Sequence, residues 1–459
     1  MRLLALLGLL VACSPAAPSE RPNVLLVVLD TTRADLLSAY DHPAPTSPHL
    51  EKLAREGALL TRAYSTDFWT LPSHASLLTG LYPSEHGATS ETNRLGPGVE
   101  TLAEYLAGAG YSTAGFVSNP WISRETGFAQ GFGSFTETWR EAGQPPDRQA
   151  VERAGRFIAN EARARRPFFV FVNLNDAHMP YSPDPQVLHE VAPRAHSVER
   201  TRRLKRLVGT WEYLAGAVVL DETDLDILRD LYQGELRTVD GHLGELVAAL
   251  TAAGVLNDTL VIVTADHGEN LGEHGLIDHM LSMYDTTIRV PLVIRFPSRV
   301  EAGRVVPEVA SLVDVLPTIL DAVGIEPPAG AGRSLLGDTP AAPRGFVIAE
   351  NERPHNGIRL LETGFPEFDT SKIDGRMRML RTDRYKLIWS EGRVELYDLE
   401  ADPGEQRDLG AEMPQLRDEL LGELEAWMAA SKMRSGAAAA PGPVDPRARE
   451  QLRALGYVE

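Results

Sequence analysis

The chain has 459 residues, of which 43% are hydrophobic and 24% charged, and its formal net charge at pH 7 is −19. This length allows a large core and about two domains. The acidic balance excludes a protein that binds nucleic acid through a basic surface. It fits an enzyme that captures an anionic substrate locally, through a metal ion.

The N-terminus is predicted to be an export signal. An apolar run from Leu3 to Ala12 is too short to cross a membrane and is followed by Cys13. Residues 10–13 resemble a bacterial lipobox, so we expect residues 1–20 to be a lipoprotein-type signal and tether. The protein would then be an exported bacterial lipoprotein, in the periplasm or at the cell surface, and attached to a membrane by a lipid on Cys13. The alternative is an ordinary cleaved signal with an incidental cysteine.

Predicted strands and helices alternate through the first two thirds of the chain. The continuous apolar run Val24–Leu29 is typical of a central parallel strand. Further strands are expected at 113–117, 168–174, 259–264 and 291–296, and helices at 47–56, 70–80, 99–109, 148–165, 224–253 and 313–323. The pattern predicts an α/β fold with a doubly wound, mostly parallel sheet. Residues 180–217 are expected to form an irregular surface excursion or lid.

The character of the sequence changes after Leu336. Short strand-like segments at 345–349, 376–381, 385–389 and 395–399 precede an amphipathic helix at 416–430. They predict a small antiparallel sheet covered by one helix. The expected domains are therefore a catalytic α/β domain at 21–336, a C-terminal α+β subdomain at 345–432 and a mobile tail at 433–459.

The segment Phe68–Gly80 is predicted to be a short helix with a hydroxyl at its start. Pro72 suits the first turn, and Gly80 suits the residue that follows the last turn. The Thr70 hydroxyl would then face free backbone N–H groups and the positive end of the helix dipole. Such a position favours anion binding and an activated nucleophile. A plain N-cap is the alternative for this stretch alone.

Polar side chains follow four of the predicted strands. They are Asp30, Asn119, Asp176 with His178, and Asp266 with His267. Because ligands of open α/β sheets bind beyond the carboxyl ends of the strands, these residues predict a site at one sheet edge.

A divalent metal ion is the expected cofactor at this edge. Asp30, Asp266 and His267, together with Thr70, would form a four-ligand set for Mn²⁺, Zn²⁺, Mg²⁺ or Ca²⁺. The ion would lower the pKa of the Thr70 hydroxyl and neutralise a substrate oxygen. The alternative for Asp266 and His267 is a turn in which the aspartate caps the next helix.

The order of these motifs resembles the sulfatase family within the alkaline phosphatase superfamily. The matching segments are 22–35, 70–87, 264–276 with 288–292, 312–318, and 395–399 with 402–403. These five segments stand in the order that the family has, and the resemblance extends over nearly the whole mature chain. The resemblance implies an alkaline-phosphatase-like fold and metal-dependent ester hydrolysis.

The chain departs from the family pattern at four positions. Classical sulfatases carry Cys or Ser in place of Thr70, and that residue is converted to formylglycine. Conversion to formylglycine requires that the side-chain carbon that bears the sulfur or oxygen is a CH₂ group. In threonine this carbon also carries a methyl group, so the unmodified Thr70 hydroxyl is expected to act as the nucleophile. The family has Arg at the position of His74, a second Asp at Thr31 and a Lys at His279.

With a threonine at position 70, the remaining motif residues are similar to those of the threonine-nucleophile members of the superfamily. These members include phosphoglycerol and phosphoethanolamine transferases and some phosphodiester or phosphonate-ester hydrolases. This resemblance implies a hydrolase or transferase that acts on phosphoesters or phosphodiesters through a covalent Thr70 intermediate. It also implies that the enzyme binds one or two divalent metal ions. The substrate would be a small-molecule, lipid-linked or glycan-linked anionic ester. A sulfuric ester hydrolase on the same site and a catalytically degenerate binding protein are the alternatives.

Four further residues are candidates for contacts with the substrate. His178 and His279 would bind phosphoryl oxygens or protonate the leaving group. Alternatively, either could complete a second metal site with Asp176, or be an ordinary hydrogen-bonding residue. His74 and Asn119 are candidate substrate-binding residues.

Overall fold

The computed structural model describes residues 21–206, 210–330, 332–337, 344–434 and 446–454. The predicted signal and Cys13 lie outside these residues. Within the described part of the chain, no helix is both long and apolar enough to cross a membrane.

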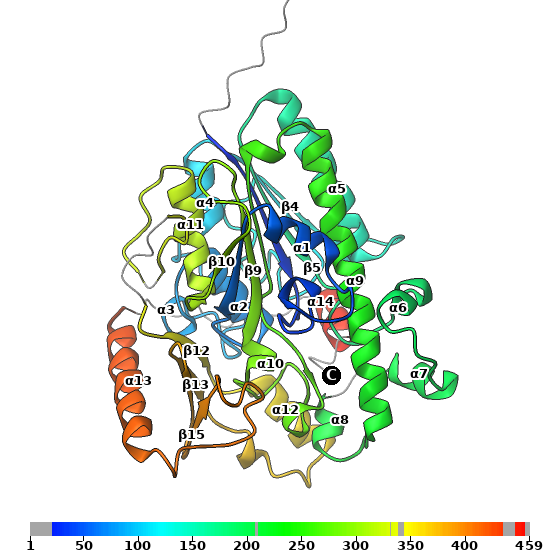
Figure 1. The fold of residues 1–459 in the computed structure, drawn as a ribbon, viewed down its shortest axis with the longest axis vertical. Coiled ribbons are helices and arrows are strands. Elements are labelled where there is room, and N and C mark those ends of the chain that lie inside the picture. Colours follow the sequence, from blue (N-terminus) through cyan, green and yellow to red (C-terminus); the bar gives the residue numbers. More distant parts are fainter. Residues whose placement is uncertain (1–20, 207–209, 331, 338–343, 435–445, 455–459) are drawn as a thin grey trace, which may run out of the picture.

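A nine-stranded sheet forms the centre of the molecule (Figure 1), and its strand order is β10-β2-β9-β6-β1-β5-β3-β4, with β11 paired to β2. Neighbouring strands are parallel except around β9, which runs antiparallel to β2 and β6. The predicted doubly wound, mostly parallel sheet is confirmed. Its strands are β1 (Asn23–Leu29), β2 (Ala58–Tyr64), β3 (Ser112–Val117), β4 (Ser134–Glu137), β5 (Phe168–Leu174), β6 (Thr259–Thr264), β9 (Arg289–Arg295), β10 (Arg304–Val306) and β11 (Ala310–Ser311).

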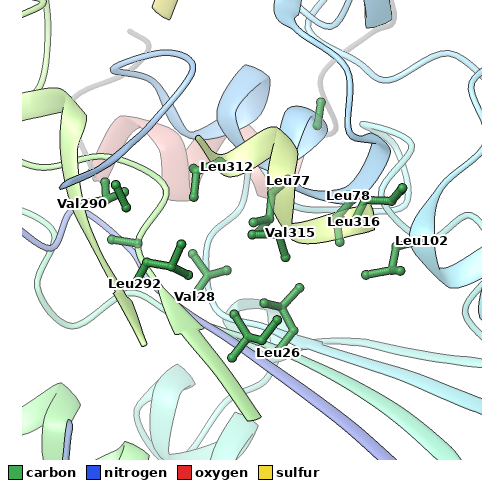
Figure 2. Close-up of a cluster of buried hydrophobic side chains, with 14 of the residues drawn as sticks. Leu26, Val28, Leu77, Leu78, Leu102, Val290, Leu292, Leu312, Val315 and Leu316 are labelled. Carbon is green, nitrogen blue, oxygen red and sulfur yellow. The ribbon is translucent and has the colours of Figure 1, made fainter. Parts of the chain in front are cut away.

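Helices cover both faces of this sheet because alternate residues of β1 point to opposite sides. Leu26 and Val28 join one core cluster, while Leu25 and Val27 join the other. Figure 2 shows the first cluster, where β1 and β9 meet α2 and α11. The helices on this face are α2 (Thr70–Thr79), α4 (Leu102–Gly108) and α11 (Val315–Ala322), and those on the other are α1 (Pro48–Arg55), α5 (Pro146–Ala164) and α9 (Glu222–Ala252).

Helix α2 lies deeper than the other helices around the site. All ten of its residues are buried. It is enclosed by the sheet, α11, α4 and the short helix α3 (Pro83–His86). The residue at its N-terminus is therefore held by packing on every side.

The expectation of irregular structure at 180–217 is wrong for half of that segment, which contains α6 (Pro185–Val191), α7 (Val198–Leu204) and α8 (Thr210–Leu214). The Asp184 side chain accepts a hydrogen bond at the start of α6, and Ser197 does the same for α7. Such caps stabilise short helices. Strands β2 and β4 were also not expected from the sequence.

The predicted C-terminal antiparallel sheet is confirmed, with the order β12-β13-β14-β15. Its leucines pack beneath α13, while Met379 and Ile388 pack against the catalytic domain. Lys386 is fully buried between Asp285 and Glu405, at 2.8 and 2.7 Å, and so joins the two parts. The elements are β12 (Val347–Asn351), α12 (His355–Gly364), β13 (Met377–Arg381), β14 (Tyr385–Ser390), β15 (Arg393–Asp398) and α13 (Pro414–Arg434).

The end of the chain differs from the expected mobile tail. Residues 446–454 form α14, and Leu452 is buried in the core of the catalytic domain. The tail prediction is therefore wrong for this helix, while residues 435–445 and 455–459 lie outside the described part.

Candidate active site

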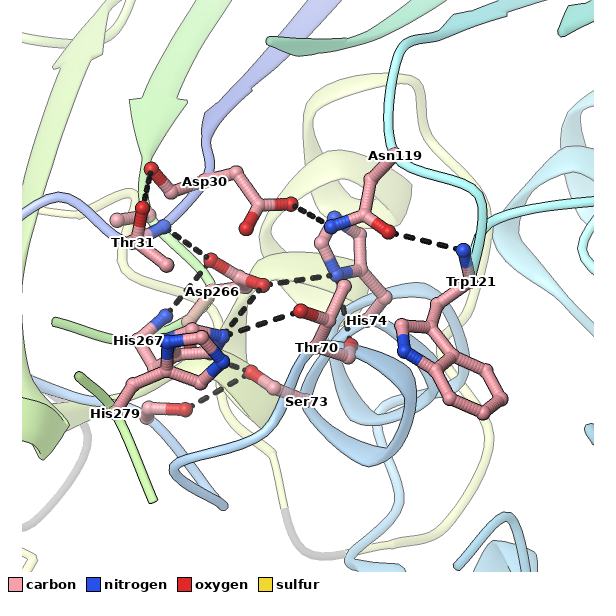
Figure 3. Close-up of polar contacts among 12 residues, drawn as sticks. Asp30, Thr31, Thr70, Ser73, His74, Asn119, Trp121, Asp266, His267 and His279 are labelled. Carbon is pink, nitrogen blue, oxygen red and sulfur yellow. Dashed lines mark hydrogen bonds and ion pairs between the residues drawn. The ribbon is translucent and has the colours of Figure 1, made fainter. Parts of the chain in front are cut away.

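The four predicted metal ligands lie together at the carboxyl edge of the sheet (Figure 3). Asp30 follows β1, Asp266 and His267 follow β6, and Thr70 is the first residue of α2. The carboxylates and the imidazole offer ligand atoms within 4.8 Å of one another. The Thr70 Oγ1 lies 3.2 Å from His267 Nε2. All four side chains are fully buried.

The Thr70 hydroxyl is not used as a helix cap. Trp69 occupies the N-cap position of α2, and among the described residues no side chain caps this helix. The alternative of a plain N-cap is therefore not what the structure shows. The hydroxyl faces His267 instead.

The site fits a divalent cation. The Asp30 Oδ1 atom is buried and has no hydrogen-bond partner within the described part of the chain, and the buried Asp266 Oδ2 atom has only the longer contacts to the His74 and His267 rings, at 3.4 and 3.3 Å. An unsatisfied buried acceptor costs roughly 1–3 kcal/mol, and more when it is charged. Carboxylate oxygens together with an imidazole and a hydroxyl form a normal ligand set for such an ion.

The electrostatics of the two carboxylates agree with this fit. Burial, followed by repulsion from Asp266, raises the pKa of Asp30 to about 7. Burial also acts to raise the pKa of Asp266, but His267 and His74 more than offset it, so this pKa lies below its usual value. A positive charge between the two carboxylates would remove their repulsion.

His267 has the tautomer that a metal ligand requires. Its Nδ1 lies 3.0 Å from the Gly268 carbonyl oxygen, which can only accept, so Nδ1 carries the proton. The Nε2 lone pair therefore points to Thr70. Burial lowers the pKa of His267 to about 3, so the ring is neutral near pH 7.

Two asparagines orient Asp30 from behind. Asn119 and Asn173 each donate through Nδ2 to Asp30 Oδ2 at 2.9 Å. Asn119 also donates to Asn175 Oδ1 and accepts from the Trp121 backbone N–H. Both Nδ2 protons of Asn119 are therefore used inside the protein. The expectation that Asn119 donates to substrate is wrong, and this residue positions Asp30 instead.

His74 likewise lies beneath the site and does not line it. Its Nδ1 is 2.9 Å from the Thr70 carbonyl oxygen and 3.4 Å from Asp266 Oδ2, and its Nε2 is 3.3 Å from Asn173 Nδ2. The ring is fully buried, and both nitrogens face protein groups. The predicted role in substrate binding is therefore replaced by a role in holding Asp266 and the first turn of α2.

His178 and His279 lie beside His267. The His279 ring stacks on His267 with centroids 4.4 Å apart, and the His178 centroid is 5.0 Å from that of His279. Burial lowers the pKa of His178 to about 4. Burial also acts to lower the pKa of His279, but Asp278 and Glu269 raise it well above its usual value. The three histidine rings thus form a continuous row, with His267 nearest to Thr70 among them.

Asp176 does not join these histidines. Its Oδ2 lies 3.2 Å from His242 Nε2 on α9. A second group that could hold an ion is made instead by Glu269, Asp278 and His279. The structure thus does not support a second metal site built on Asp176.

Sequence reasoning missed Asn173 and the role of Thr31. Asn173 is the only polar residue of the strand sequence FFVFVNL, and this exception within an apolar run was the available signal. The Thr31 backbone N–H donates to Asp266 Oδ1, and its φ of 53° is strained for a β-branched residue. Tyr232 holds this conformation by donating to the Thr31 carbonyl oxygen.

An Asn173→Ala variant is expected to bind divalent metal about 10–100-fold more weakly, since residues that orient a ligand have effects of this size. The substitution removes one of the two amides that fix Asp30. Calorimetric titration with Mn²⁺ measures the change. Asn257→Ala, in the middle of the peripheral turn Leu256–Asp258, is the control and should bind normally. Equal affinity of both variants would contradict the assigned role.

Fold and site together indicate an ester hydrolase of the alkaline phosphatase superfamily, with acidic and histidine side chains that could hold a divalent metal ion. The chain belongs to the sulfatase family, because the model of that family matches residues 22–325. Residues 272–430 also match the model of the N-sulphoglucosamine sulphohydrolase C-terminal family. Enzymes of the sulfatase family generally use a divalent metal, in agreement with the acidic and histidine groups found here.

Individual relatives include both sulfatases and phosphonate hydrolases. Arylsulfatase K from Bos taurus is 27% identical over 449 residues, covering 87% of this chain and 80% of the relative. The phosphonate monoester hydrolase of Agrobacterium radiobacter has a TM-score of 0.72 and 24% identity, covering 90% of this chain and 96% of its own. A 2-O GAG sulfatase has a TM-score of 0.72 and 21% identity, with coverages of 94% and 96%.

Proposed function

We propose that this protein is a divalent-metal-dependent hydrolase or transferase of phosphoesters, and that Thr70 is its covalent nucleophile. One observation carries the proposal. The hydroxyl of Thr70 stands 3.2 Å from His267 Nε2, within the predicted ligand set of a buried cation, and it serves no capping role. The metal would be Mn²⁺, Zn²⁺, Ca²⁺ or Mg²⁺.

The proposed reaction is an in-line displacement at phosphorus. A bond forms between Thr70 Oγ1 and phosphorus, and the bond from phosphorus to the leaving-group oxygen breaks. A divalent ion held by Asp30, Thr70, Asp266 and His267 would lower the pKa of the hydroxyl and neutralise charge on the phosphoryl oxygens. His178 and His279 would contact those oxygens, and His279, whose pKa is raised, would supply the proton that the leaving oxygen takes up. Water or an acceptor alcohol then attacks phosphorus and releases Thr70.

Two features favour phosphate over sulfate. The methyl group of Thr70 prevents the conversion to formylglycine that classical sulfatases use. In addition, His74 stands where the family carries an arginine, and its ring is committed to Thr70 and Asp266. A sulfuric ester hydrolase remains the second candidate because arylsulfatase K is among the relatives.

The substrate is proposed to be an anionic ester of a small molecule, a lipid or a glycan. One structural neighbour was solved in complex with D-glucosamine-2-N,6-O-disulfate, which favours a compact anionic ester in this fold. Export and lipid attachment at Cys13 stay a prediction and would place the site at a membrane.

The test is a substrate panel with the Mn²⁺-loaded protein. Bis(p-nitrophenyl) phosphate, p-nitrophenyl phosphate and p-nitrophenyl sulfate share one leaving group, so their kcat/KM values compare the transferred group directly. We expect a phosphate ester to exceed the sulfate by at least about 10-fold, a transition-state difference of about 1.4 kcal/mol. Cleavage of the sulfate alone would overturn the proposal, and turnover of none of the three would favour a degenerate binding protein.

A further inference from the structure

We infer that a basic groove beside α9 binds an anionic amphiphile, a molecule in which an acidic head group is joined to an apolar chain. The groove encloses about 580 Å³, within the usual range of small-molecule pockets. Its walls include Leu188, Val198, Arg202, Lys205, Ile227 and Leu231, and no residue of the proposed active site lines it. The inference therefore goes beyond the proposed function and does not depend on it.

The groove forms because two short helices lie against the long helix α9 (Figure 1). Helix α6 ends at Val191 and α7 begins at Val198, so a loop joins them. This loop is held by the buried Asp230 of α9, which pairs with Arg194 and, at 2.6 Å, with His196. The two helices and the loop thus enclose a space over one face of α9.

The floor of the groove is apolar. Ile227 and Leu231 close its bottom, and they lie four positions apart, on the same face of α9. The accessible apolar surface comes from Leu188, which is half-buried, and from Val198, which is 71% exposed. The aliphatic stems of the basic side chains add to it. An alkyl chain would therefore be buried on this floor.

The rim of the groove is basic, although the chain as a whole carries a net charge of −19. Residues 198–206 contain five basic side chains and one acidic side chain. Arg200 is engaged by Asp221 at the start of α9, at 2.7 Å. Arg203 is likewise engaged by Asp224, at 2.5 Å. These ion pairs hold α7 against α9 and leave the other three basic side chains to line the groove.

The three lining side chains, Arg202, Lys205 and Arg206, form no ion pair with a carboxylate in the described part of the chain. Lys205 Nζ donates to the uncharged Pro183 carbonyl oxygen, at 3.4 Å. Asp230 cannot neutralise them because both of its oxygens are used by the loop. At spacings of three and four positions, like charges on a helical turn repel one another. An acidic head group would be attracted to all three.

Floor and rim together define the ligand. An inorganic anion would leave the apolar surface in water, and a neutral apolar molecule would leave the three charges without a counter-charge. A carboxylate or phosphate on an alkyl chain satisfies both. Such a molecule could be a membrane lipid or be free in solution.

The test is calorimetric binding of octanoate, butanoate and 1-octanol to the Mn²⁺-loaded protein. Butanoate has a shorter chain than octanoate, and 1-octanol lacks its charge. We expect octanoate to bind at least about 10-fold more tightly than butanoate, because each buried CH₂ group raises affinity up to about fourfold. It should bind about threefold more tightly than 1-octanol, and added NaCl should reduce this advantage.

Arg202→Gln and Lys205→Gln should each weaken octanoate binding about threefold and leave 1-octanol binding unchanged. Val198→Ser should weaken both ligands, and its exposed position makes unfolding no concern. Arg163→Gln is the matched control and should bind as wild type. Arg163 is an exposed arginine of α5 that forms no ion pair among the described residues and does not line the groove.

Vesicles separate the two sources of the ligand. Octanoate binding together with a preference for phosphatidylglycerol over phosphatidylcholine vesicles, reduced in Arg202→Gln, supports a membrane lipid. Octanoate binding without that preference supports a free amphiphile. A vesicle preference without octanoate binding would overturn the groove, because the basic side chains would then act on a membrane surface.

Equal affinity for octanoate and butanoate, or for octanoate and 1-octanol, would also overturn the inference. The same holds for equal losses in Arg163→Gln and Arg202→Gln, which would reflect overall charge alone. Phosphoester turnover should be unchanged in Arg202→Gln, and its loss would contradict a groove separate from the active site.

Discussion

A Thr70→Ala variant is expected to lose phosphoester turnover by a factor of at least about 10³, because only positioning and charge stabilisation remain once a covalent nucleophile is removed. The fold should be preserved, since Thr70 is the first residue of α2 and its hydroxyl caps nothing among the described residues. The kcat and KM for bis(p-nitrophenyl) phosphate measure the effect. We expect the loss to fall on kcat.

Thr70→Ser is the matched control for this variant. It keeps the hydroxyl and should retain activity within about 10-fold. Acid quenching of the wild-type reaction should trap one phosphoryl group on the peptide that contains Thr70, and mass spectrometry should find none in Thr70→Ala. Wild-type turnover by Thr70→Ala would refute the nucleophile assignment.

The second large effect is expected for Asp266→Asn, which should lose its bound divalent ion on dialysis and its activity with it. Asp266 is fully buried, and its Oδ1 accepts from the backbone N–H groups of Thr31 and His267. An amide would remove one ligand charge, with a loss of metal affinity of about 10²-fold or more. Elemental analysis of the dialysed protein measures bound Mn²⁺.

Asp176→Asn is the control because its carboxylate lies against His242, away from the proposed ligands. It should retain the ion. Circular dichroism separates metal loss from unfolding in both variants. A folded Asp266→Asn protein that holds as much Mn²⁺ as wild type would exclude Asp266 as a ligand.

The sequence predicted the sheet and the position of Asp30 and Asp266 at its carboxyl edge because both follow from local patterns. Apolar runs mark the parallel strands, and Asp30 directly follows β1, while Asp266 is separated from the end of β6 only by Ala265. Neighbouring parallel strands place such residues at one edge whatever the details of packing.

The roles of His74 and Asn119 could not be predicted in the same way. Each depends on a partner distant in sequence: Asn173 lies 99 residues from His74, and Asp30 lies 89 residues from Asn119. Only the packed structure shows that these polar groups face one another and not a substrate. The packing of helix α14 could not be predicted for the same reason, since the core that receives Leu452 is built from residues far upstream.

Because all ten residues of α2 are buried, this helix tolerates fewer substitutions than the peripheral helices of the molecule. A substitution in this helix disturbs packing on every side, so the reactive centre has little room for evolutionary drift. Trp211 and Gly357 instead belong to the peripheral helices α8 and α12, which pack directly against each other. Substitutions are therefore expected to accumulate in peripheral helices such as α8 and α12 sooner than in α2.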